Sequence, residues 1–345
     1  MADSAFRFGK LKSNVVVNGT KNGVNNTFTT PDYYTTNTLL VFLNGFMYQP
    51  TSISQNTDHQ TFTINADNIP KATDVLTATY VDYIPNISFP NLEGYNSNLI
   101  HAYSFEESSL NIPDRAGSQD INGNYNSVTL GASGKSGNSP EFQTTYQTQH
   151  YLYRNGTSNT DHLVNNIDKF TISFWVYFDV LPSDTFPEYG IFFDDESYII
   201  EAASPSQAQC WIGKVDPPTF PVTLNFAVNG DSHVFSTSSA AFSSTGVWYH
   251  VVLLYDSVNN VAKAWVDNSQ VISTSGSYSK INNASSGSGT YGFSFGHATG
   301  PVTYAYFEHG KIDEFYVWDD ALSTDAITEL YNSGTGAFWN GSGWS

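Results

Sequence analysis

Charged side chains are scarce in this chain. Lys, Arg, Asp and Glu together make up 13% of its 345 residues, and 13 basic side chains face 32 acidic ones, for a formal net charge of −19 at pH 7. Such a surface repels phosphate and no Lys/Arg cluster offsets the repulsion, which argues against nucleic-acid binding. The acidic excess suits divalent cations, which prefer carboxylate oxygens, although net charge also simply keeps a protein soluble.

Cysteines and long apolar runs are missing as well. The single cysteine, Cys210, excludes an intramolecular disulfide, and we interpret it as a buried, inert thiol because no His-containing motif surrounds it. No segment has the length and apolarity that span a bilayer, and residues 1–10 show no signal-peptide pattern. We therefore expect synthesis in a cytosol without the usual export route.

The residues that are abundant favour β-structure. Aromatic residues make up 15% of the chain, whereas Lys, Arg, Glu and Met, which favour helices, are few. Aromatic and β-branched side chains fit a pleated, half-buried surface. The composition therefore predicts an all-β fold.

The first part of the chain, residues 1–83, is expected to form a small antiparallel β-domain. The apolar run Leu39–Leu43 is followed by Asn44-Gly45, the strongest short hairpin signal, and the sequence alternates again at Thr61–Ile64 and at Asp74–Val81.

Two of these segments carry a resemblance. Val41–Gly45, followed later by Ala78–Val81, resembles a module of phage tail-fibre and other virion structural proteins. The resemblance implies that residues 1–83 anchor the chain to other virion proteins. Any small β-sandwich with an Asn-Gly hairpin shows the same pattern, so both interpretations stay open.

Residues 84–98 contain Pro85, Pro90 and Gly94 and few periodic positions, so we predict a linker there. A longer series of strands begins at Leu99, and we expect one domain over residues 99–337 with a C-terminal tail at 338–345. Near the end, Ser323 is a good helix N-cap and Gly334 can end the helix. One face of that helix is apolar and would lie on the strands: Ile327, Leu330 and Tyr331.

Four segments of the second domain carry a second resemblance: His101–Glu107 with the turn Asp114–Gly117, Phe170–Val176, Trp248–Asp267 and Lys311–Trp318. In their order and spacing they resemble the laminin-G-like, concanavalin-A-type lectin/glucanase superfamily. The resemblance implies a two-sheet jelly-roll β-sandwich, a fold that usually serves in sugar binding or adhesion. Alternation supports it independently, because Ile172, Phe174 and Val176 share one strand face.

Members of this superfamily often hold a calcium ion where the first and last strands meet. The resemblance places Glu106, Asp114 and Asp313 there, and a structural Ca²⁺ ion would relieve the repulsion between these like charges. Pairing with Arg115 or Lys311, or simple solvation, is the alternative.

Sugar binding needs an aromatic platform beside polar groups, and the candidates are Tyr189, Asp195 and Trp211. Catalysis is not expected. The Glu-x-Asp-x-x-Glu motif of the related glucanases is absent, and no Gly-x-Ser-x-Gly sequence stands in the strand-to-helix context that a nucleophile elbow needs.

Taken together, these features predict a virion-associated adhesin, a phage fibre or a head or tail decoration, that binds host-surface glycans through the laminin-G-like domain. It would be made in the host cytoplasm and would be a homo-oligomer, with a trimer possible. A purely structural virion protein without glycan binding is the alternative, and a polysaccharide-active enzyme is the third hypothesis.

Overall fold

The computed structural model forms two compact units, Met1–Ile87 and Ser88–Ser345, each with its own hydrophobic core. Within them the structure describes these residues: 11–31, 38–55, 60–65, 69–81, 89–126, 128–142, 150–154, 161–181, 190–195, 208–214, 222–229, 233–281, 292–297, 307 and 309–345. The two units are considered one at a time below.

The first unit packs two small antiparallel sheets. The four-stranded sheet has the order β1 (Leu11–Val16), β7 (Leu76–Val81), β3 (Leu40–Leu43), β4 (Phe46–Met47). The three-stranded sheet has the order β2 (Thr27–Thr29), β6 (Thr61–Ile64), β5 (Ile53–Gln55), and a 3₁₀ turn, η1 (Pro50–Ser52), precedes β5. Asn44 and Gly45 join β3 to β4 with φ angles of 51° and 84°, so the predicted Asn-Gly hairpin is confirmed.

The four-stranded sheet turns one face away from the core. Val16 lies opposite Thr77, Thr77 opposite Phe42 and Phe42 opposite Met47. Val16 is 64% exposed and Met47 48% exposed. We name this surface the uncharged face, made up of Val16, Leu40, Phe42, Met47, Thr77 and Thr79.

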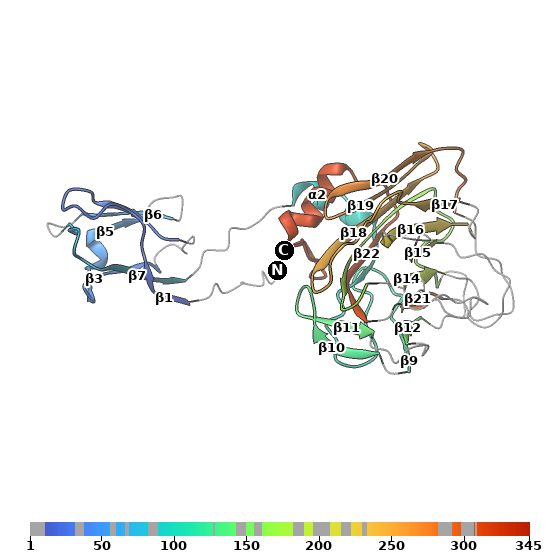
Figure 1. Ribbon diagram of the computed structural model, residues 1–345, viewed down its shortest axis with the longest axis horizontal. Helices are drawn as coiled ribbons and strands as arrows, with labels where there is room; N and C mark the ends of the chain where they lie inside the picture. Colours follow the sequence, from blue (N-terminus) through green and yellow to red (C-terminus); the bar gives the residue numbers. More distant parts are fainter. Residues whose placement is uncertain are drawn as a thin grey trace. The chain divides into compact units, whose positions relative to one another are not determined.

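The second unit is an antiparallel β-sandwich of two sheets (Figure 1). The eight-stranded sheet has the order β10 (Thr129–Ser133), β11 (Asn138–Phe142), β22 (Gly310–Trp318), β13 (Lys169–Phe178), β18 (Trp248–Asp256), β19 (Val261–Val266), β20 (Ser269–Ser275), with β8 (Leu99–Tyr103) also paired to β22. The seven-stranded sheet has the order β17 (His233–Ser236), β16 (Val222–Val228), β15 (Ala208–Lys214), β14 (Gly190–Asp195), β21 (Ser294–Phe295), β12 (Tyr151–Tyr153), β9 (Gly123–Tyr125).

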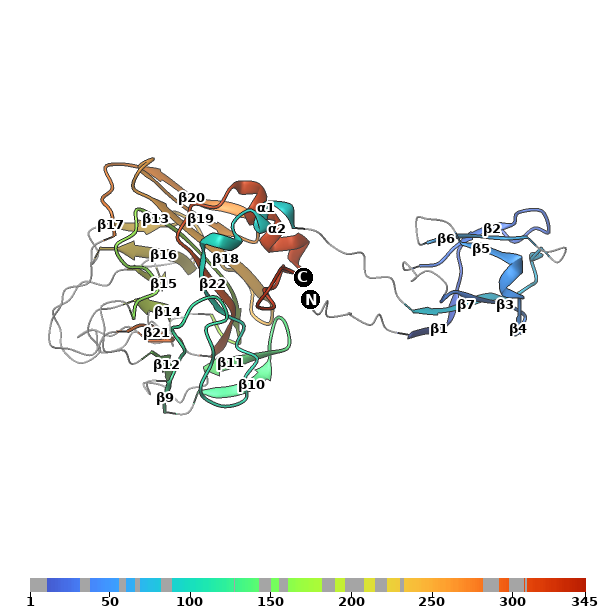
Figure 2. The same ribbon diagram turned by 180° about the vertical axis from the view of Figure 1, so that it is seen from behind.

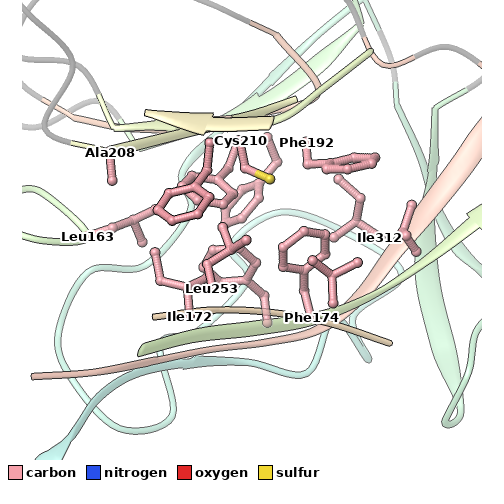
Figure 3. Close-up of a cluster of buried hydrophobic side chains, with 14 of the residues drawn as sticks. Leu163, Ile172, Phe174, Phe192, Ala208, Cys210, Leu253 and Ile312 are labelled. Atoms are coloured by element: carbon pink, nitrogen blue, oxygen red, sulfur yellow. The ribbon is translucent and has the colours of Figure 1, made fainter. Parts of the chain in front are cut away.

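The core between the sheets is rich in aromatic rings, as Figure 3 shows in part. Phe174 of the eight-stranded sheet lies with its ring centroid 5.3 Å from that of Phe192 and 6.1 Å from that of Phe193, both on the seven-stranded sheet. Cys210 is fully buried there, and burial raises the pKa of its thiol well above the usual value. The alternation predicted for Ile172, Phe174 and Val176 is confirmed, because all three are core residues.

The closing strand β22 lies in the interior of its sheet. It pairs with β13 along its length, with β11 at its start and with β8 at its end. Phe315 and Val317 face the core between the sheets, whereas Tyr316 and Trp318 belong to a second cluster on the opposite side. Residues widely separated in sequence therefore meet at this strand.

The linker predicted over residues 84–98 is wrong for 89–98, which fold onto the sandwich as α1 (Pro90–Glu93) and η2 (Asn96–Asn98). Phe89 and Leu92 are buried in the second cluster, and the Glu329 side chain accepts hydrogen bonds from Asn91 Nδ2 (2.6 Å) and from the Leu92 N–H (2.9 Å). Proline at the start of a helix supplies a suitable φ and lacks only an N–H that would be unpaired anyway, so Pro90 begins a helix here.

The predicted C-terminal helix is confirmed as α2 (Thr324–Tyr331), which lies beside α1 (Figure 2). The Ser323 side chain accepts a hydrogen bond from the Ala326 N–H, as expected for an N-cap. The helix ends earlier than predicted, because Asn332 rather than Gly334 adopts the left-handed conformation that caps it, and a 3₁₀ turn, η3 (Asn332–Gly334), follows. None of the helices in the described part of the chain is long and apolar enough to cross a membrane.

The last eight residues pack on the sandwich. Phe338 and Ser345 exchange backbone hydrogen bonds of 3.0 Å in each direction. Trp344 is buried, its ring stacks 5.8 Å from that of Trp318, and its Nε1 donates to Asn96 Oδ1 (2.9 Å). The predicted tail thus joins the second cluster to η2.

We expect Trp344→Ala to lower the free energy of unfolding of the second unit by about 3 kcal/mol, because it leaves a cavity and an unpaired Asn96 side chain. Denaturant unfolding of the full chain, followed by tryptophan fluorescence, measures this. The control is Val258→Ala, at a residue that is 66% exposed in the turn after β18, which should cost less than about 0.5 kcal/mol. Equal effects of the two substitutions would contradict a structural role for the C-terminal residues.

Candidate functional site

The seven-stranded sheet presents one face away from the core. Across its strands, Tyr153 lies opposite Ser294, Ser294 opposite Asp194, and Asp194 opposite Gln209. The chain neighbours of these residues that point the other way are core residues: Leu152, Phe295, Phe193 and Cys210. Because successive side chains of a strand alternate between faces, this row lies on the side of the sheet away from the core, which we name the outer face. Ser294 and Asp194 in the middle of the row are buried, whereas Tyr153 and Gln209 at its ends are partly exposed.

At one end of the outer face, aromatic rings stack across the strands. The ring centroid of Tyr151 lies 4.8 Å from that of Tyr125 and 4.7 Å from that of His297, and the Tyr153 ring is 5.5 Å away. We call these four residues the tyrosine stack. A side chain at Gly123 would overlap the Tyr153 ring, so glycine is needed where that ring crosses β9.

Two members of the tyrosine stack, Tyr151 and His297, are uncharged at neutral pH. Burial, and then the nearby phenols of Tyr125 and Tyr153, raise the pKa of Tyr151, so its hydroxyl keeps its proton. Burial lowers the pKa of His297 to about 4, so this imidazole is neutral at pH 7. Tyr125 is 43% exposed, and Tyr151 and Tyr153 are half-buried, so the stack combines accessible ring surface with hydroxyl groups.

Further along the outer face, Trp211 provides another partly exposed ring. It lies opposite Asn225 on β16, which is buried, and it shares its face with the partly exposed Gln209, two residues earlier on β15. An aromatic ring beside an accessible amide is an arrangement that binds sugars, since the ring packs on C–H groups and the amide bonds to hydroxyls. Of the three ligand candidates predicted from the sequence, Trp211 lies on the outer face.

Asp195, the second predicted ligand candidate, faces the interior. Its carboxylate is fully buried and accepts hydrogen bonds from the Val164 N–H (2.8 Å) and, at 2.9 Å, pairs with Nδ1 of His162. The strand register shifts between Ile191 and Phe193, which places Asp194 outside and Asp195 inside. The remaining candidate, Tyr189, lies outside the described residues.

Asp114, one of the three predicted calcium ligands, organises its own turn. Its carboxylate pairs with Nδ1 of His101 (2.6 Å) and accepts hydrogen bonds from the N–H groups of Ala102 (2.9 Å) and Gly117 (2.9 Å). Burial by itself would raise the pKa of Asp114, but the bonds from His101 and from the backbone lower it. This carboxylate is therefore held by nitrogen donors.

Glu106 and Asp313 lie on either side of the loop between β10 and β11. Asp313 Oδ2 accepts from the N–H groups of Lys135 (2.7 Å) and Ser136 (3.2 Å), and Glu106 Oε2 accepts from that of Asn138 (2.9 Å). The structure thus brings Glu106 and Asp313 to the same loop, whereas Asp114 accepts its hydrogen bonds in a different turn.

The three carboxylates do not fit a shared calcium ion. In the part of the chain that the structure describes, no three His, Cys, Asp or Glu side chains are grouped so that they could hold a metal. Calcium needs six to eight oxygen ligands, whereas these carboxylates already accept backbone N–H groups. Backbone N–H groups donate hydrogen bonds to these carboxylates and so stabilise their negative charge. The calcium prediction had given that role to a cation.

A pair of buried acids sits in β22 instead. The register of β22 with β13 shifts between Ser173 and Trp175, and Glu314 takes a φ of 51° in that bulge. Burial raises the pKa of Asp313 well above its usual value and that of Glu314 to about 8, and the neighbouring acid adds to the effect on Asp313. The Tyr316 hydroxyl donates to Glu314 Oε2.

With the fold and this face established, comparison with known proteins places the chain. The model of the concanavalin A-like lectin/glucanases superfamily matches residues 153–328, slightly more than half of the sequence. The chain belongs to this superfamily. The match runs from the end of β12 to α2 and so includes strands of both sheets. No curated protein sequence matches the chain.

Several solved structures are similar to part of the chain at low identity. Domain 4 of an extracellular arabinanase from Geobacillus stearothermophilus, solved with arabinotriose, is 17% identical with a TM-score of 0.45, covering 69% of this chain and 98% of that one. A pentraxin from Limulus polyphemus is 16% identical with a TM-score of 0.39, covering 55% and 79%. The binding domain of botulinum neurotoxin serotype D is 12% identical with a TM-score of 0.44, and the match covers 71% of this chain and 53% of that one.

The buried acids make stability depend on pH. A carboxyl group whose pKa is raised in the folded state binds its proton more tightly there than in the unfolded chain. The sandwich should therefore lose stability as the pH rises from about 4.5 through about 8, the interval between the ordinary and the folded pKa of Glu314. Glu314→Gln, which cannot ionise, should flatten this decline in the free energy of unfolding measured from pH 5 to pH 8. Glu93→Gln, at an exposed position of α1, should keep the wild-type slope, and an unchanged slope in Glu314→Gln would refute the assignment.

Proposed function

We propose that the chain is a virion-associated adhesin, a phage fibre or a head or tail decoration, that binds host-surface glycans without turning them over. The outer face of the seven-stranded sheet would take the glycan, and the first unit would attach the chain to the particle. The observation that carries the proposal is the placement of the partly exposed rings of the tyrosine stack and of Trp211 on one face, together with the Gln209 amide.

The chemistry of this face suits a sugar. The ring surfaces of Tyr125 and Trp211 can pack against the C–H faces of a pyranose, while the Gln209 amide and the tyrosine hydroxyls can exchange hydrogen bonds with its hydroxyl groups. The superfamily to which the chain belongs is named after lectins and glucanases, and both classes of protein bind carbohydrates. The Glu-x-Asp-x-x-Glu motif is absent from the sequence, which favours binding over hydrolysis.

The distribution of charge supports separate roles for the two units. Residues 1–87 contain 5 Lys or Arg and 6 Asp or Glu, a formal charge of −1. The remaining 8 basic and 26 acidic side chains give residues 88–345 a formal charge of −18. A nearly neutral unit with an uncharged face can pack against another protein of a particle without Coulomb repulsion, whereas the sandwich is repelled by other acidic surfaces.

Glycan binding by the full chain tests the main proposal. On a glycan array, we expect Tyr151→Ala and Trp211→Ala each to weaken binding of the recognised glycan by roughly tenfold or more, the loss that follows when an aromatic anchor is removed. Val258→Ala, on a turn of the other sheet, should bind like the wild type. Binding in EDTA should equal binding in calcium, because the described residues offer no grouped metal ligands.

Wild-type protein that binds no glycan would sink the adhesin proposal and favour the purely structural alternative. Consumption of a bound polysaccharide, measured as released reducing ends, would favour the enzyme.

The anchoring role has its own measurement. We expect the full chain to sediment with purified virions, and Phe42→Asp with Met47→Asp to abolish this, because two charges on the uncharged face cannot be buried without loss of binding. Val24→Asp, an exposed loop position of the same unit, is the matched control. Circular dichroism of each variant checks that the first unit still folds, and sedimentation that survives both Asp substitutions would remove the uncharged face from the attachment site.

A further inference from the structure

The outer face of the seven-stranded sheet has few basic residues. Within the strands that form the sheet there is a single Lys or Arg, Lys214, the last residue of β15. On β14, Asp194 lies on the side of the outer face and is buried, and Asp195 faces the interior. Arg154 directly follows β12, but its guanidinium is already used, with Nη2 bonded to Asp161 Oδ1 (3.1 Å) and Nη1 to the Asp120 carbonyl (3.1 Å). His297 in the tyrosine stack is neutral at pH 7, because burial lowers its pKa to about 4.

The segments of the second unit that lie outside the described ranges add no cation, because they contain no Lys or Arg at all. They do contain seven acidic residues, namely Asp184, Glu188, Glu196, Glu201, Asp216, Asp231 and Glu308. This holds wherever those segments lie, since it depends on their composition alone.

An anionic sugar needs a counter-charge. A carboxylate or sulfate taken from water onto a protein surface is stabilised by Arg or Lys, most effectively by a bidentate guanidinium. Here such a group would approach a unit with a formal charge of −18. It would find neutral hydroxyls, amides, one Arg that is already paired, and Lys214 at the end of β15. A neutral sugar has no such cost, because hydroxyl groups need only hydrogen-bond partners.

We infer that the glycan bound on this face is uncharged, built from neutral hexoses or N-acetylhexosamines, and that sialylated, uronic or sulfated glycans are rejected by electrostatic repulsion. This inference rests on the proposed function and names the ligand class of the same site. Rejection comes from the shortage of cations among the described residues of this face, so it acts without any steric barrier and depends on salt.

The experiment compares matched glycans on the full chain. The probes are a neutral oligosaccharide that the array identifies and the same oligosaccharide with one terminal sialic acid, at ionic strengths of about 0.01 M and about 0.15 M. The Debye length falls from about 30 Å to about 8 Å between these conditions. At low salt, we expect the sialylated probe to bind at least about threefold more weakly than the neutral probe. This difference in affinity should become smaller at the higher salt.

Two variants with the same change in net charge locate the effect. Gln209→Lys places a cation on the outer face, whereas Val258→Lys places one in the turn after β18 on the other sheet. Gln209→Lys should raise the ratio of sialylated to neutral binding by about threefold or more at low salt, and Val258→Lys should change it much less.

Equal or tighter binding of the sialylated probe to the wild type would overturn the inference and leave the adhesin proposal standing. A gap that does not respond to salt would also overturn it, since rejection would then be steric. Binding of neither probe and of no other glycan would instead refute the proposed function itself.

Discussion

The second unit depends on the packing of two sheets through buried aromatic rings. Phe174 lies between Phe192 and Phe315 with ring-centroid distances of 5.3 and 5.7 Å, and similar contacts run through the core. Burial of this much apolar surface is the largest favourable contribution to the free energy of folding. Because it fixes which side of every strand faces inward, it also decides which side chains reach the outer surfaces. The packing of the core therefore determines which residues form the candidate site.

The elements of the fold could be predicted from the sequence where the signal was local. The alternation of Phe170–Val176, the Asn44-Gly45 hairpin and the Ser323 cap each depend on a few adjacent residues, and the structure has all three. Residues 89–98 were misjudged, because Pro90 and Gly94 look alike in a linker and in a short helix that is stabilised by Glu329, far along the chain. That contact is tertiary and leaves no local trace.

The candidate site was harder to predict, because it depends on cross-strand register. Phe192 and Phe193 both point into the core, which only the irregular pairing around them makes possible, and this sends Asp194 out and Asp195 in. Simple alternation cannot reveal it. The pairing of Tyr125 with Tyr151, and of Trp211 with Asn225, joins residues that are 26 and 14 positions apart in the sequence. The alternation Gln209-Cys210-Trp211 was the one signal that could have identified part of the face.

The hydrogen bonds that attach residues 89–98 to the sandwich affect how it would respond to a pulling force. A pull transmitted along the chain from the first unit arrives at Phe89, and it loads side-chain bonds from this segment to three sites: Glu329, Asp319 and Trp344. These partners lie on or near α2 and at the C-terminal end, so tension would be shared among several bonds before it reached β8. The strand pairing of β8 with β22, which holds Tyr103 in the core, would thereby be protected from being pulled apart one hydrogen bond at a time.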